Sequence, residues 1–137
     1  MKREIKFRGK SIDSGEWVYG DLIQLDTQLC IAGVHQWAGV PANNSIEIDV
    51  TKIIPETFGQ FTGMKDKSGK EVYEGDIVRF CDDHPYCSDY IVKYDEERLM
   101  WIADGVGDFM EDLWELDEDY VEVIGNIYDN AELLNDK

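Results

Sequence analysis

The side chains with the clearest potential for chemistry lie together in one short segment, residues 81–87. Thiolate, carboxylate and imidazole groups are all ligands of zinc, and this segment supplies each of them. The candidate metal ligands are Cys81, Asp83, His84 and Cys87. A structural zinc site needs four ligands, commonly from paired Cys-x-x-Cys motifs, which this sequence lacks. We therefore predict no metal and no other cofactor, and treat these cysteines and the histidine as structural or incidental.

No catalytic motif accompanies this segment. The chain contains no Gly-x-Ser-x-Gly, His-Glu-x-x-His, Walker or Gly-x-Gly-x-x-Gly pattern. Its two histidines, His35 and His84, are the only side chains of the type that titrates near neutral pH. Carboxylates are so numerous that choosing one pair as acid and base carries no information. We predict that the protein is not an enzyme, and a metal-dependent hydrolase built on residues 81–87 is the least favoured alternative.

Charge is divided unevenly along the chain. The 137 residues include 13 Lys and Arg against 30 Asp and Glu, which gives a formal net charge of −17. Residues 1–70 contain nine basic and nine acidic side chains, whereas residues 71–137 contain four and 21. A negative charge of this size repels a phosphate backbone. We therefore expect no direct binding to nucleic acid.

The acidic excess has three interpretations. It forms a solvated face that keeps the protein soluble, or it binds a basic partner protein, in one version by mimicking nucleic acid. In the third interpretation it docks on the basic N-terminal residues of a second copy, which leads to a ring or a filament. The candidate partner surface consists of Asp108, Glu111, Asp112, Glu115, Asp117, Glu118 and Asp119. The basic residues of the third interpretation are Lys2, Arg3, Lys6, Arg8 and Lys10.

The N-terminal residues, the hydropathy and the cysteines of the sequence together indicate in which cellular compartment the protein resides. The N-terminus leads into alternating polar and apolar residues, not into the apolar run of a secretory signal. No window approaches the length of a membrane span, and the mean hydropathy is −0.41. Three irregularly spaced cysteines fit reduced thiols better than a disulfide framework. We expect a soluble cytoplasmic protein with reduced thiols and no membrane partner.

The elements that must position these side chains are mostly strands. Alternation of apolar and polar residues predicts strands over residues 4–8, 16–25, 46–50, 70–80, 90–103 and 120–128, with turns inside the longer ranges. A short apolar run predicts a buried strand over residues 29–34. Gly20 is expected to bend its strand. Asp66 is expected to close a turn through its side chain, in which Gly69 takes a positive φ. Apolar spacing predicts one amphipathic helix between Asp108 and Asp117, and a short turn over residues 131–134.

These elements predict a mainly β fold, of the β-rich α+β class. An N-terminal β subdomain, residues 1–62, is expected to pack on a small SH3-like β-barrel with one short acidic helix, residues 63–130. A C-terminal turn and tail, residues 131–137, complete the chain.

Three stretches resemble the YopX family of phage and prophage proteins, and they occur in the same order. They are Arg3-Glu4-Ile5-Lys6-Phe7-Arg8-Gly9 with Trp17-Val18-Tyr19-Gly20-Asp21-Leu22, then the long segment from Gly59 to Val78, and finally the segment from Glu122 to Asn130. The resemblance implies a small, mostly β protein encoded by a phage or prophage, and a homo-oligomer. It implies no established reaction, so no active site is carried over. Residues between Phe80 and Tyr120 match no motif of the family.

These observations predict an accessory protein of a phage or prophage, without enzymatic activity, that assembles with itself. Its further partner is expected to be a basic host or phage protein, bound by the acidic C-terminal half. The first alternative is an acidic mimic of nucleic acid that inhibits a host DNA-processing protein.

Overall fold

The computed structural model describes residues 3–36, 46–82, 86–105 and 109–134, and in these the chain is mainly β. It divides into two compact units, Met1–Gln60 and Phe61–Lys137. No helix in the described part of the chain is both long and apolar enough to cross a membrane.

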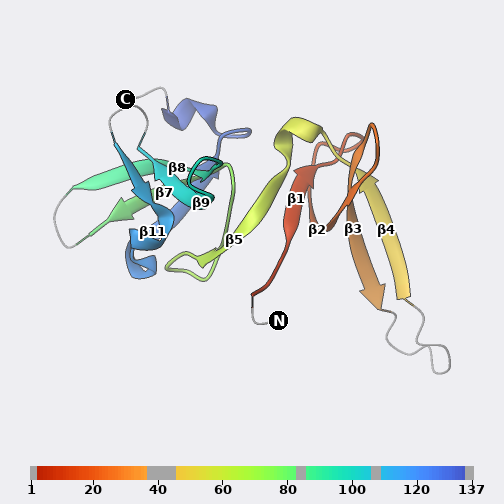
Figure 1. Ribbon diagram of the computed structural model, residues 1–137, viewed down its shortest axis with the longest axis horizontal. Coiled ribbons are helices and arrows are strands. Elements are labelled where there is room, and N and C mark those ends of the chain that lie inside the picture. The colour runs from red at the N-terminus through yellow and green to blue at the C-terminus, as the bar shows by residue number, and fades with distance from the viewer. Residues whose placement is uncertain (1–2, 37–45, 83–85, 106–108, 135–137) are drawn as a thin grey trace. The chain divides into compact units, whose positions relative to one another are not determined.

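Strands dominate the first unit (Figure 1). They are β1 (Phe7–Lys10), β2 (Trp17–Gln24), β3 (Leu29–Gln36) and β4 (Ile46–Lys52), followed by the 3-10 turn η1 (Pro55–Thr57). β2 pairs with β1 up to Gly20 and with β3 from Asp21 onward. The predicted bend position is thus where the strand changes partner. A Cβ at Gly20 would collide with the carbonyl oxygen of Ala32, so only glycine permits this close approach.

The second unit is built on an antiparallel sheet. β5 (Gly59–Lys65) begins in the first unit and ends in the second. The following elements are β6 (Glu71–Tyr73), β7 (Asp76–Cys81), β8 (Cys87–Asp95), β9 (Met100–Asp104), β10 (Met110–Asp112), η2 (Leu113–Glu115), η3 (Glu118–Tyr120), β11 (Val121–Asn126) and η4 (Ala131–Leu134). One sheet has the strand order β4-β3-β2-β1-β5-β6 and the other β10-β9-β8-β7-β11.

The mainly β class is confirmed, whereas the SH3-like barrel is not. Among the described residues both sheets are open, because β10 and β11 end the second sheet and do not pair with each other. The core of the second unit forms on the sheet and on the turns that follow β10. Its buried members are Val72, Val78, Tyr90, Val92, Ala103, Leu113, Leu116 and Val121.

The helix predicted between residues 108 and 117 is wrong. Met110–Asp112 instead pairs with β9, and a 3-10 turn follows. Leu113 and Leu116 are both buried, and their spacing of three residues suits a 3-10 turn as well as it suits an α-helix. Glu115 and Asp117 would also lie at the negative end of the helix dipole, which disfavours an α-helix. Asp108 lies outside the described residues.

The carboxylate of Asp66 organises the turn between β5 and β6. Its Oδ1 accepts hydrogen bonds from the backbone amides of Ser68 and Lys70, each at 2.9 Å, and its Oδ2 accepts one from the amide of Val123 at 3.0 Å. Gly69 has φ +84°, as this turn requires. The predicted side-chain closure is confirmed, and the bond to Val123 adds a link to β11. Burial would raise the pKa of Asp66, but these amide bonds outweigh burial and lower the pKa from its ordinary value.

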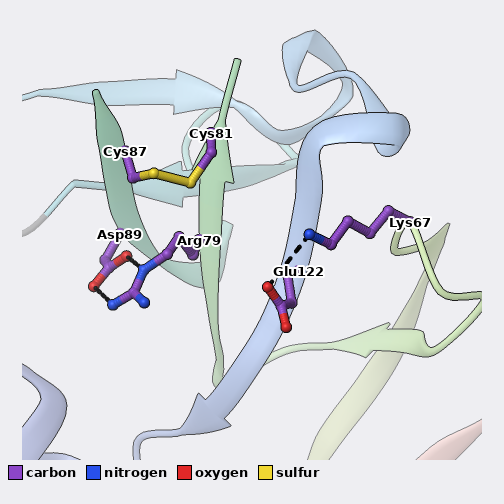
Figure 2. The surroundings of a disulfide bond; sticks show 6 residues. All are labelled: Lys67, Arg79, Cys81, Cys87, Asp89 and Glu122. Carbon is purple, nitrogen blue, oxygen red and sulfur yellow. Dashed lines mark hydrogen bonds and ion pairs between the residues drawn. A yellow bond between two sulfur atoms is a disulfide. The ribbon is translucent and has the colours of Figure 1, made fainter. Parts of the chain in front are cut away.

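A disulfide joins the ends of β7 and β8. Cys81 and Cys87 lie opposite each other in the register, with Cα atoms 4.3 Å apart (Figure 2). The expectation of reduced thiols is therefore wrong for this pair, while Cys30 is a free, buried thiol. Two residues along each strand, the guanidinium of Arg79 binds Asp89 through two hydrogen bonds of 2.8 and 3.1 Å. This hydrogen bond and the charge of Asp89 raise the pKa of Arg79. Two links, the disulfide and the Arg79–Asp89 ion pair, therefore join β7 to β8 on one face of the hairpin.

Replacing Asp66 with asparagine should destabilise the protein. The amide group leaves one backbone N–H without an acceptor, and the expected loss is about 1 to 3 kcal/mol in the free energy of unfolding. Because the pKa of Asp66 is lowered in the folded state, its stabilisation is complete above the pKa of the unfolded chain and disappears as pH falls through the folded pKa. Urea unfolding of the wild type and Asp66→Asn at several pH values should show a difference that shrinks in acid. The exposed Asp13→Asn should behave as wild type, and a constant difference at all pH values would contradict this role.

Reduction of the disulfide should weaken the second unit without unfolding it. A closed loop of this length contributes about 2 kcal/mol in the chain-entropy model, and Arg79 and Asp89 still join the two strands after reduction. Urea unfolding with and without dithiothreitol should therefore give a lower midpoint in the reduced protein. The control is Cys81→Ser/Cys87→Ser. Its urea midpoint should equal that of the reduced wild type and should not change when dithiothreitol is added. Equal midpoints for oxidised and reduced wild type would refute the contribution.

Candidate functional site

The acidic residues predicted as a partner surface fall on β10 and on the two turns after it. Glu111 and Asp112 are half-buried in β10. The other described members lie at the surface, at the end of η2 and around η3. They are Glu115, Asp117, Glu118 and Asp119. The six members of the predicted set that lie in the described residues therefore divide into a half-buried pair and an exposed group of four.

Apolar anchors hold this exposed group in place. Leu113 and Leu116 are each 3% exposed and belong to the core of the second unit. The side chain of Asp117 accepts a hydrogen bond from the backbone amide of Asp119 at 3.0 Å, which caps η3. Between the two leucines, Trp114 is 72% exposed. An indole so exposed on an anchored turn is presented to solvent without contributing to the core.

The half-buried pair is engaged inside the unit. The guanidinium of Arg98 contacts Asp95 at 3.0 Å and Asp112 at 2.8 Å. The hydrogen bond to Asp95 raises the pKa of Arg98 and lowers that of Asp95. Burial raises the pKa of Tyr90, and the charge of Glu111 raises it further. Asp112 thus has a role within the fold through its contact with Arg98.

The turn between β8 and β9 adds an apolar side chain to the same region. Leu99 is 73% exposed and has φ +56°, an uncommon backbone conformation for a leucine. It follows Arg98, whose contact with Asp112 joins this turn to β10. Met110, two residues before Asp112, is also exposed. We call the resulting set the acidic–apolar surface: Leu99, Met110, Trp114, Glu115, Asp117, Glu118 and Asp119.

Reasoning from the sequence missed the apolar part of this surface. In the predicted amphipathic helix, which does not form, Met110 and Trp114 belong to the apolar set and would face the core. Leu99 carries no local signal, because leucine has no preference for a positive φ. Residues 104–122 do carry a usable signal, since they contain nine Asp and Glu and no Lys or Arg. An aromatic residue inside such a segment is a candidate for exposure.

The structure does not support a metal site at the predicted candidate ligands. Cys81 and Cys87 are bonded to each other, so neither offers a thiolate in this structure. Asp83 and His84 lie outside the described residues. In the described ranges no group of three or more His, Cys, Asp or Glu side chains is placed to hold a metal ion. Figure 2 shows charged pairs around the disulfide: Arg79 with Asp89, and Lys67 with Glu122 at 3.5 Å.

Comparisons with known proteins agree with the motifs in the sequence. The chain is similar over nearly its full length to the crystal structure of protein EF1440 from Enterococcus faecalis, with a TM-score of 0.60 and 22% identity. The similarity covers 97% of this chain and 99% of that one, and it shows a shared fold. No curated protein has a detectably similar sequence. The model of the family described as YopX protein matches residues 6–135. This chain belongs to the YopX family.

Proposed function

We propose that this chain is a non-enzymatic protein-interaction module, which binds a basic surface of a partner protein through the acidic–apolar surface and also assembles with itself. In this proposal it is an accessory protein of a phage or prophage, acting in the host cytoplasm on a host or phage protein. The observation that carries the proposal is the exposed Trp114, which stands between two buried leucines and within five residues of four exposed carboxylates in the sequence.

The chemistry of this surface supports a protein partner. Tryptophan is enriched among the residues that contribute most to protein–protein affinity, because it buries a large area and loses little conformational freedom. Carboxylates around such a residue steer a positively charged partner toward it and exclude acidic ones. A partner with an apolar depression bordered by Lys or Arg therefore fits the acidic–apolar surface.

Mimicry of nucleic acid is the second candidate function. It is supported by the nine acidic residues within 104–122, a stretch without basic residues. A mimic would occupy the groove of a DNA-processing protein mainly through charge. The two functions differ in what Trp114 contributes. In a mimic the carboxylates provide most of the affinity, whereas in the module Trp114 provides it.

Trp114→Ala should abolish capture of the partner. We expect immobilised wild-type protein to bind at least one protein from a bacterial host lysate in a saturable and salt-sensitive manner. Trp114→Ala should weaken this binding by about tenfold or more, while Tyr86→Ala, which removes another highly exposed aromatic ring, should bind normally. If Glu115→Gln/Glu118→Gln abolishes binding and Trp114→Ala does not, the mimic is correct. If no protein is bound in a saturable manner, both functions are wrong.

A further inference from the structure

One face of the β1–β2 pair gathers cationic and aromatic side chains. In the antiparallel register Arg8 lies opposite Tyr19, and Lys10 lies opposite Trp17. Residues directly opposite each other in such a pair share a face, as do residues two apart on one strand. We call this set the cationic–aromatic face: Arg8, Lys10, Trp17 and Tyr19.

The members of this face are in contact with one another. The guanidinium carbon of Arg8 is 4.5 Å from the centre of the Trp17 ring, and the ammonium nitrogen of Lys10 is 5.5 Å from a ring centre of the same indole. Both distances lie within the range of a cation–π interaction. Arg8 is 5% exposed, whereas Tyr19 is 50% exposed. Tyr19 is therefore the exposed member of the face, Lys10 and Trp17 are half-buried, and Arg8 is buried.

The other face of β1 belongs to the core of the first unit. A Cβ at Gly9 would collide with the side chain of Ile53, which is fully buried. Phe7 stacks on Phe58 with ring centres 5.6 Å apart. Because apolar residues occupy that face, the cationic–aromatic face is the side of β1 directed away from this packing.

The chain carries two segments of opposite local charge. Residues 1–10 contain five Lys and Arg and a single acidic residue, Glu4, whose carboxylate contacts Lys6 at 2.9 Å. Residues 104–122 contain nine acidic residues and no basic ones. Each segment has the charge that the other lacks. Aromatic rings accompany both: Tyr19 and Trp17 of β2 lie opposite Arg8 and Lys10, and Trp114 lies within residues 104–122.

We propose that the cationic–aromatic face binds the acidic–apolar surface of a second copy of this chain. This inference rests on the proposed function and identifies the acceptor for self-assembly. Lys10 and the Tyr19 hydroxyl donate hydrogen bonds to carboxylates of the second copy, and its Trp114 packs against the aromatic rings. The two surfaces are different, so each copy can use both. Such a head-to-tail contact builds a ring or a filament.

Charge reversal on either surface should dissociate the assembly, and mixing the two variants should restore it. We expect wild type to sediment above its single-chain mass of 15.8 kDa. Lys10→Glu removes the acceptor, and Glu115→Lys/Glu118→Lys removes the acidic surface. Each variant alone should associate about tenfold more weakly or worse. In an equimolar mixture, the intact acidic surface of the first variant meets the intact acceptor of the second, so mass above a single chain should return.

Matched controls separate this contact from a general effect of charge. Lys52→Glu and Asp13→Lys/Glu132→Lys make the same changes in charge at other exposed positions and should assemble as wild type does. Thermal unfolding verifies that every variant is folded. The proposal is overturned if wild type sediments as a single chain, if either charge-reversed variant assembles normally, or if the mixture remains at single-chain mass. A single-chain wild type whose partner capture still depends on Trp114 would leave the partner-binding part of the proposed function standing and would remove self-assembly.

Discussion

The carboxylate of Asp66 connects parts of the second unit that are far apart in the sequence. It accepts two hydrogen bonds within its own turn and a third from Val123, 57 residues further along the chain. The backbone amide of Lys67 also donates to the carbonyl of Val121 at 2.9 Å. These bonds fix β11 to the turn after β5, and β11 in turn pairs with β7. The long segment from Gly59 to Val78, on which the resemblance to the family rests, therefore contributes to folding, because Asp66 and Gly69 set the geometry of its turn.

The second unit tolerates a large negative charge for two reasons: some carboxylates are bonded inside the fold, and apolar burial holds others in place. Residues 61–137 contain 22 acidic and seven basic side chains. Some carboxylates are used inside the fold: Asp66 and Asp76 accept from backbone amides, and Asp89 binds Arg79. The exposed carboxylates around η3 stay close together although they repel one another, because Leu113 and Leu116 fix the turns to the core. Apolar burial thus maintains a surface that electrostatics alone would disperse.

Much of this fold is predictable from the sequence because its signals are local. Alternation predicts most strands of both units, and Asp66 with Gly69 predicts a turn, since side-chain chemistry and positive φ act within a few residues. The helix prediction failed because apolar spacing in residues 109–116 fits a strand followed by 3-10 turns equally well, and pairing with β9 decided between them. The disulfide depends on register: the pairing that sets Ile77 opposite Ile91 also sets Cys81 opposite Cys87. The sequence specifies the strands there but not their alignment.

The acidic–apolar surface is the part that the sequence predicts least completely, for a related reason. Its charge is a property of composition and can be counted in the sequence. The exposure of Leu99 and Trp114 depends on the folded backbone, because apolar side chains are ordinarily expected in the core. If that surface binds both a partner protein and the cationic–aromatic face of another copy, the two contacts exclude each other. Mass action then favours assembly at high concentration of the chain and release of the surface at low concentration. Self-assembly would in that case regulate partner binding through concentration alone, with no change of conformation in either unit.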